Sequence, residues 1–84
     1  MSNIFKTRIQ TLHSSLVIES TDTRNTLKAA TAAKILQYIK WIVSSKTRKE
    51  IKEKINQVIT HLNKYRNQEV KEVNSELSVL YTLV

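Results

Sequence analysis

The chain has 84 residues, of which 40% are hydrophobic and 25% charged, and its formal net charge is +7. This balance favours one small folded domain, residues 1–84, over a disordered chain. Because the chain has no cysteine and no glycine, disulfides, thiolate metal sites and glycine-rich phosphate-binding loops are excluded. Proline is absent as well, although average usage would supply about four prolines and six glycines. The composition therefore predicts an all-α fold with short polar connections.

A first helix is predicted from the N-terminus, where Ser2 or Asn3 can cap it. Its apolar residues stand at i, i+4, i+7 and i+11, the spacing of one helix face. They are Phe5, Ile9, Leu12 and Leu16. The polar run 20–23 interrupts this pattern and supplies side chains that could cap the next helix.

A second helix is predicted from about Thr23 to Ser45. One arc of this helix is apolar and is expected to be buried. The residues on this arc are Ala32, Ile35, Leu36, Ile39, Ile42 and Val43. A second stripe on nearly the opposite side carries Leu27, Lys34, Tyr38 and Trp41. Apolar residues on two sides indicate a helix that contacts two neighbours in a bundle.

The third helix is predicted to begin at Thr47, because Thr47 and Glu50 have capping-box spacing ahead of an apolar run. That run contains Ile51, Ile55, Val58, Leu62 and Tyr65, and a further run contains Val70, Val73, Leu77, Leu80 and Val84. One straight helix from Arg48 to Leu83 would be about 54 Å long and would suggest a coiled-coil dimer. A turn near Asn67 would instead give a fourth helix.

The polar residues Asn63, Asn67 and Gln68 favour the turn. We therefore expect a small bundle of three or four helices. Its expected core includes Phe5, Ile9, Leu12, Leu16, Ile35, Leu36, Ile39, Ile42, Ile55, Val58, Leu62, Val73, Leu77 and Leu80.

The positive charge is concentrated in residues 24–54, which hold nine of the fourteen basic residues and two of the seven acidic ones. Such a local positive field attracts nucleic acid, anionic lipid or an acidic protein surface, although it also serves solubility alone. Together with the Trp-bearing stripe, this segment is the predicted partner-binding surface. Its residues are Lys34, Tyr38, Trp41, Lys46, Arg48, Lys49, Lys52 and Lys54. The alternative for Trp41 is packing between helices of its own bundle.

Patterns for catalysis and metal binding are absent from the sequence. His13 and His61 stand 48 residues apart and are expected at the edges of apolar stripes. No acidic residue forms a Glu-x-x-His pair, and the row Glu69, Glu72 and Glu76 is typical of a solvated helix face. We predict no enzymatic activity, no cofactor and no metal site.

The expected function is that of a small cytoplasmic regulator that binds one protein partner stoichiometrically, the partner presenting an acidic surface. By analogy with small basic bundles, it would be an adaptor, inhibitor or immunity-type protein of bacterial or phage type. We also expect a low-order homo-oligomer, a homodimer. The alternative function is nucleic-acid binding through residues 24–54, and a third is peripheral membrane contact through the Trp-bearing helix. The cytoplasmic expectation rests on a first segment, MSNIFKTRIQ, without the apolar stretch of a secretory signal.

Overall fold

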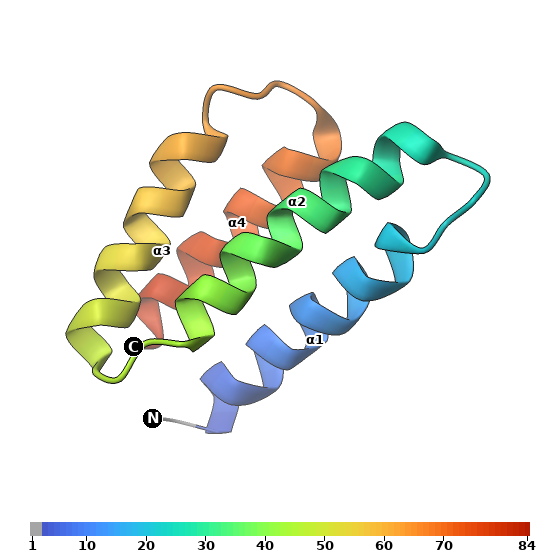
Figure 1. Ribbon diagram of the computed structural model, residues 1–84. Helices are drawn as coiled ribbons and strands as arrows, with labels where there is room; N and C mark the ends of the chain where they lie inside the picture. The colour runs from blue at the N-terminus through green and yellow to red at the C-terminus, as the bar shows by residue number, and fades with distance from the viewer. Residues whose placement is uncertain (1–2) are drawn as a thin grey trace.

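The computed structural model describes residues 3–84, and over that range it contains four α-helices and no strand. The helices are α1 (Asn3–Ser20), α2 (Thr26–Val43), α3 (Arg48–Leu62) and α4 (Gln68–Thr82). Consecutive helices run in opposite directions, and α4 returns to pack against α1 (Figure 1). Each helix therefore contacts two neighbours around a ring, which makes the protein an up-down four-helix bundle.

The predicted all-α bundle is confirmed, and the alternative of one helix from Arg48 to Leu83 is wrong. Because the chain turns after Leu62, the long helix that would form a coiled-coil dimer is absent from residues 3–84. The radius of gyration of 12.4 Å is close to the value of about 12 Å expected for a compact chain of this length.

One hydrophobic cluster fills the bundle and draws side chains from all four helices. It contains Phe5, Ile9, Leu16, Ala32, Ile35, Leu36, Ile39, Ile42, Ile51, Ile55, Val58, Leu62, Val70, Val73, Leu77 and Leu80. Among the described residues no polar or charged side chain is buried. The expected core is thus confirmed except for Leu12, which is half-buried against the cluster.

Two residues of the predicted core-facing stripes are exposed. Val43 is 52% exposed, because it is the last residue of α2 and faces only a shallow groove with Lys6 and Ile9 of α1. Tyr65 is 41% exposed, because the chain has already left α3 at Leu62 and places this ring in the following turn.

The start of α2 differs from the prediction, because its cap is Asn25 and lies after the polar run 20–23. The Asn25 side chain accepts a hydrogen bond from the backbone N–H of Lys28 at 3.0 Å. The polar run closes its own turn instead: the Thr21 hydroxyl donates to the Ile18 carbonyl at 2.9 Å. For α1, which begins at Asn3, the predicted cap at Ser2 lies outside the described residues.

Side-chain caps also begin α3 and α4. Thr47 Oγ1 accepts from the N–H of Glu50 at 3.1 Å, and a carboxylate oxygen of Glu50 accepts from the N–H of Lys46 at 3.2 Å. The predicted capping box is therefore present, with its return bond shifted by one residue. Asn67 Oδ1 accepts from the N–H of Val70 at 2.9 Å and starts α4 where the sequence placed the turn.

Replacing Ile39 by Ala should lower the free energy of unfolding by about 2–5 kcal/mol, because a fully buried side chain leaves a cavity among tightly packed neighbours. Urea denaturation followed by circular dichroism measures this loss. Leu27→Ala is the matched control: Leu27 is 79% exposed on the same helix, and its truncation should change stability by less than about 0.5 kcal/mol. Equal losses at the two positions would contradict the observed packing.

Replacing Asn67 by Ala should cost about 1 kcal/mol, because the N–H of Val70 loses its acceptor at the start of α4. Asn67→Asp should restore most of this stability, since its carboxylate can accept the same bond and lies at the positive end of the helix dipole. Thermal unfolding of both variants is the measurement. An Asp variant as unstable as the Ala variant would show that the cap does not set the turn.

Candidate functional site

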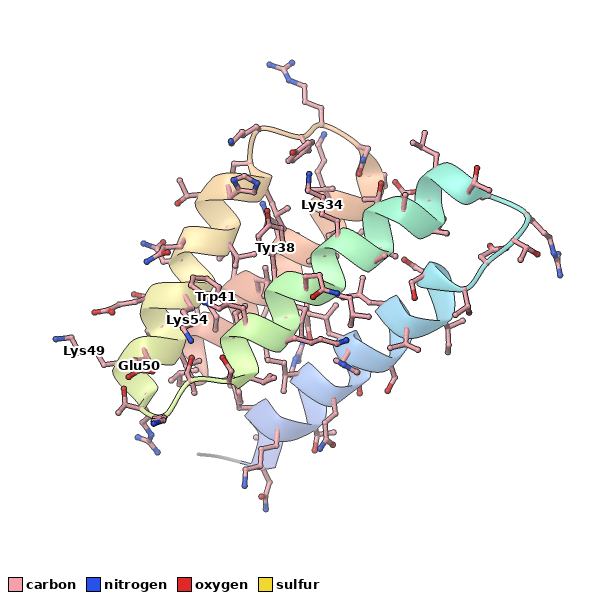
Figure 2. The ribbon with its side chains drawn as sticks, in the orientation of Figure 1. Lys34, Tyr38, Trp41, Lys49, Glu50 and Lys54 are labelled. Atoms are coloured by element: carbon pink, nitrogen blue, oxygen red, sulfur yellow. The ribbon has the colours of Figure 1, made fainter. Side chains whose placement is uncertain are left out.

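A row of aromatic and basic side chains runs along the groove between α2 and α3. From α2 come Lys34, Tyr38 and Trp41 at i, i+4 and i+7, which place them on one helix face. From α3 and the turn after it come Lys54, His61 and Tyr65. These six residues are called the α2/α3 row below. Figure 2 shows its labelled members, Lys34, Tyr38, Trp41 and Lys54, following the length of α2 on its α3 side.

Trp41 and Lys54 form one end of the row. The Lys54 Nζ lies 5.0 Å from the centre of the Trp41 ring, within the range of a cation–π interaction. The same ammonium donates to the Trp41 carbonyl at 3.1 Å and to the Ser44 hydroxyl at 3.5 Å. That carbonyl belongs to the last turn of α2, where carbonyls lack backbone N–H partners and the helix carries partial negative charge; the Ser44 hydroxyl also donates to it, at 2.7 Å. Lys54 therefore caps α2 from the neighbouring helix and holds the indole beside itself.

Trp41 nevertheless stays at the surface, with 41% of its area exposed. Beside it, a shallow depression is lined by Tyr38, Gln57, Val58 and His61. An indole in this position has one side against its own bundle and the other open to solvent. It is therefore a groove residue and takes no part in the buried core.

The middle of the row consists of three rings in succession. The ring centres of Tyr38 and His61 lie 5.4 Å apart, and those of His61 and Tyr65 lie 6.2 Å apart, both distances being typical of aromatic contacts. The Lys34 Nζ lies 6.0 Å from the Tyr65 ring centre. His61 and Tyr65 were not among the predicted site residues. The position of His61, seven residues after Lys54 on the same face of α3, is the signal that could have identified it. Tyr65 lies beyond the end of α3, so helical spacing does not mark it.

The basic residues that follow α2 do not all lie on one face of the bundle. Lys52 lies on the far side of α3, with its Nζ 5.2 Å from the Tyr81 ring of α4, because two helical residues turn a side chain by about 200°. Lys46, Arg48 and Lys49 are exposed around the turn into α3, and Lys49 points away from the bundle (Figure 2). The structure thus brings the predicted residues Lys34, Tyr38, Trp41 and Lys54 together and places three further cations at one end of them.

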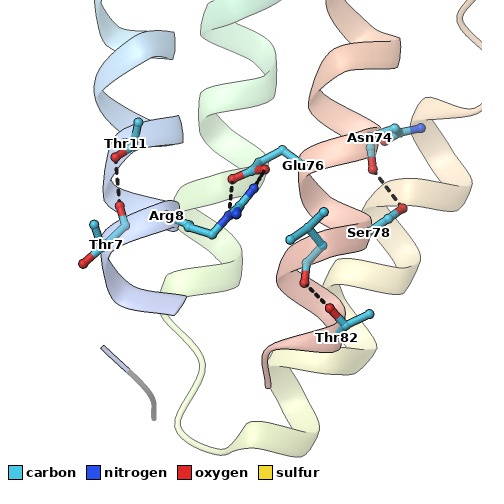
Figure 3. A network of polar contacts seen from close by, with 8 residues as sticks. Thr7, Arg8, Thr11, Asn74, Glu76, Ser78 and Thr82 are labelled. Carbon is cyan, nitrogen blue, oxygen red and sulfur yellow. Dashed lines mark hydrogen bonds and ion pairs between the residues drawn. The ribbon is translucent and has the colours of Figure 1, made fainter. Parts of the chain in front are cut away.

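Most of the acidic side chains lie on the opposite side, between α1 and α4. Glu19, Glu69 and Glu72 line a groove between these helices. Glu76 accepts two hydrogen bonds from Arg8, at 2.6 and 3.1 Å, in the only ion pair within residues 3–84 (Figure 3). These hydrogen bonds and the negative charge of Glu76 raise the pKa of the Arg8 guanidinium above its usual value. The α2/α3 side consequently carries the excess positive charge.

Within residues 3–84 no three His, Asp or Glu side chains converge as metal ligands would, and no helix combines the length and hydrophobicity that crossing a bilayer requires. Comparison with protein-family models, curated proteins and solved structures gave no significant match. The α2/α3 row is therefore the surface feature on which a functional interpretation depends.

The contact between the Lys54 ammonium and the Trp41 ring should contribute about 0.5–1 kcal/mol to stability, the usual value for a partly exposed cation–π pair. A double-mutant cycle with Trp41→Ala and Lys54→Met measures it from urea denaturation. The hydrogen bond from Lys54 to the residue 41 carbonyl is present with either side chain at position 41, so the cycle isolates the ring. Trp41→Ala with Lys52→Met is the control, because Lys52 contacts Tyr81 instead. Equal coupling in the two cycles would contradict the contact.

Proposed function

We propose that this protein is a small cytoplasmic regulator that docks its α2/α3 row stoichiometrically on an acidic surface of one protein partner. An adaptor, inhibitor or immunity-type protein works in this way. The observation that supports the proposal is the row itself: half-exposed Trp and Tyr rings, each beside a lysine, on the positively charged side of the bundle. Trp and Tyr are among the residue types that most often dominate binding energy at protein interfaces, and the lysines beside them add attraction for an acidic surface.

The geometry of the rings favours a protein partner over a nucleic acid. Single-stranded nucleic acids stack their bases on open ring faces, whereas the Lys54 ammonium lies over Trp41 and the Lys34 ammonium lies near Tyr65. Phosphate binding also favours a long track of free cations. Here the cations without ring contacts form two separate groups, Lys46, Arg48 and Lys49 at one end of the row and Arg66 and Lys71 at the other, so they do not make one continuous track.

The charge distribution favours a partner that is acidic and different from this chain. Two copies meeting through the row would each bring part of a net charge of +7, and like charges repel. An acidic protein surface would instead be attracted to Lys46, Arg48 and Lys49 and then meet the rings behind them. The predicted homodimer stays a prediction, and it would have to use another face.

Trp41→Ala should weaken partner binding by about 2 kcal/mol or more, roughly thirtyfold, because an aromatic anchor at the centre of an interface carries much of the affinity. The measurement is affinity capture from the native cells with the wild-type and variant proteins as bait, followed by titration of the recovered partner. Lys49→Glu should also weaken binding, through charge. Its matched control is Lys6→Glu, an equal charge change at an exposed lysine of α1, away from the α2/α3 row.

Three results would contradict this proposal. Binding that survives both Trp41→Ala and Lys49→Glu would remove the α2/α3 row from the interface. Equal losses for Lys49→Glu and Lys6→Glu would indicate a general effect of charge. Recovery that disappears after nuclease treatment, and falls steeply between low and physiological salt, would favour the nucleic-acid alternative.

A further inference from the structure

Two pockets meet at Tyr65, at the end of the bundle where α3 turns into α4. The first lies between α2 and this turn, has a volume of about 220 Å³, and is walled mainly by Ile35, Tyr38, Leu62 and Val70. The second lies between the end of α3 and α4 and is polar, with Asn63, Arg66, Lys71, Asn74 and Ser75 around it. Tyr65 and Val70 line both, so the two form one feature, called the Tyr65 double pocket below.

The size of the first pocket suits a single side chain. Pockets that hold whole cofactors or drug-sized molecules usually have volumes of about 300–1,000 Å³, and this one is smaller at about 220 Å³. Its lining is mainly apolar, and Thr31, Lys34 and Asn67 are its polar members besides the two tyrosines. A large aliphatic or aromatic side chain is therefore its best-matched occupant.

The surroundings of the double pocket are cationic. Lys34 lines the first pocket and Arg66 and Lys71 line the second, while no carboxylate lines either among the described residues. α4 separates its charges by side: Lys71 faces the second pocket, and Glu69 and Glu72 face the groove with α1. An occupant that carries a carboxylate next to its apolar group is complementary to this arrangement.

Asn74, which lines the second pocket, has one unpaired polar atom. Its Nδ2 donates to Asn63 Oδ1 at 2.9 Å and to the Ile59 carbonyl at 3.4 Å. Its Oδ1 is buried and accepts no hydrogen bond within the described part of the chain. A buried acceptor without a donor is costly, and a donor in the pocket would reach it only if the Asn74 side chain turned toward the pocket. A peptide supplies backbone N–H donors together with an apolar and an acidic side chain.

We infer that the Tyr65 double pocket holds a segment of the protein partner in which a large apolar side chain stands beside an acidic one. The apolar group enters the first pocket, and the carboxylate lies among Lys34, Arg66 and Lys71. Because the pockets share a wall, the two side chains come from neighbouring positions on one face: i and i+2 in an extended segment, or i and i+3 or i+4 in a helix. The inference rests on the proposed function, since Lys34, Tyr38 and Tyr65 belong both to the double pocket and to the α2/α3 row.

A display library of random 12-residue peptides, selected on the immobilised wild-type protein, tests this inference. Enriched peptides should carry the apolar and acidic pair at the stated spacing. Synthetic copies are then titrated by fluorescence polarisation against Ala30→Trp, which places a bulky ring at the first pocket. Ala33→Trp is the matched control, because Ala33 is also an exposed alanine of α2 but does not line the pocket.

Ala30→Trp should weaken peptide binding by about tenfold or more, whereas Ala33→Trp should change it less than about twofold, circular dichroism confirming that both fold. Changing the peptide's acidic residue to its amide should weaken binding to the wild-type protein severalfold. Failure to enrich such peptides, or equal binding to Ala30→Trp and wild type, would overturn the inference.

If cellular partner binding is lost with Trp41→Ala but unchanged in Ala30→Trp, the proposed function stands and the inference about the double pocket is wrong. If partner binding is unchanged by both Trp41→Ala and Lys49→Glu while peptide binding is still weakened by Ala30→Trp, the proposed function is wrong instead.

Discussion

The three turns of this bundle depend on side-chain caps, because the chain has no glycine to reverse direction with. Within residues 3–84 no residue has a positive φ angle. Asn25, Thr47 and Asn67 each accept a hydrogen bond from the N–H three residues later, and each thereby sets where the next helix begins. Helix lengths, and with them the alignment of the four apolar stripes, follow from these positions. If α3 continued past Leu62, the stripe of α4 could not return to α1.

Because the core is apolar, the charged side chains of the described residues all lie at the surface. No polar side chain is buried among the described residues, so charge is sorted by helix side. α4 shows this most clearly: Glu76 pairs with Arg8 of α1, while Lys71 and Asn74 face the end of α3. The result is an acidic groove between α1 and α4, away from the positively charged α2/α3 side. A charged partner would be oriented by this difference in charge between the two sides before it makes contact.

The lysines of the α2/α3 row both contact the aromatic rings and supply positive charge at the surface. Lys54 binds the last turn of α2 and lies beside the Trp41 ring, and Lys34 lies near the Tyr65 ring. These contacts restrict the rings without neutralising the ammonium groups, so the row presents ordered aromatic surface and positive charge together. Ordering the side chains before binding lowers the entropy that an interface would otherwise lose. This combination connects the stability of the α2–α3 pair to its proposed role in binding.

The sequence by itself determined the helical class, the capping box at Thr47 and nearly all of the core, because these depend on interactions three or four residues apart. It favoured a turn at Asn67 over one continuous helix without deciding between them, and the structure decided for the turn. The sequence also identified Lys34, Tyr38 and Trp41 as one helix face. Only the tertiary structure decided that Lys54 lies beside Trp41 while Lys52 lies beside Tyr81, and that His61 and Tyr65 complete the row. Such pairs depend on how each helix is rotated against its neighbours. That rotation is set by the packing of the whole core, which no local pattern records.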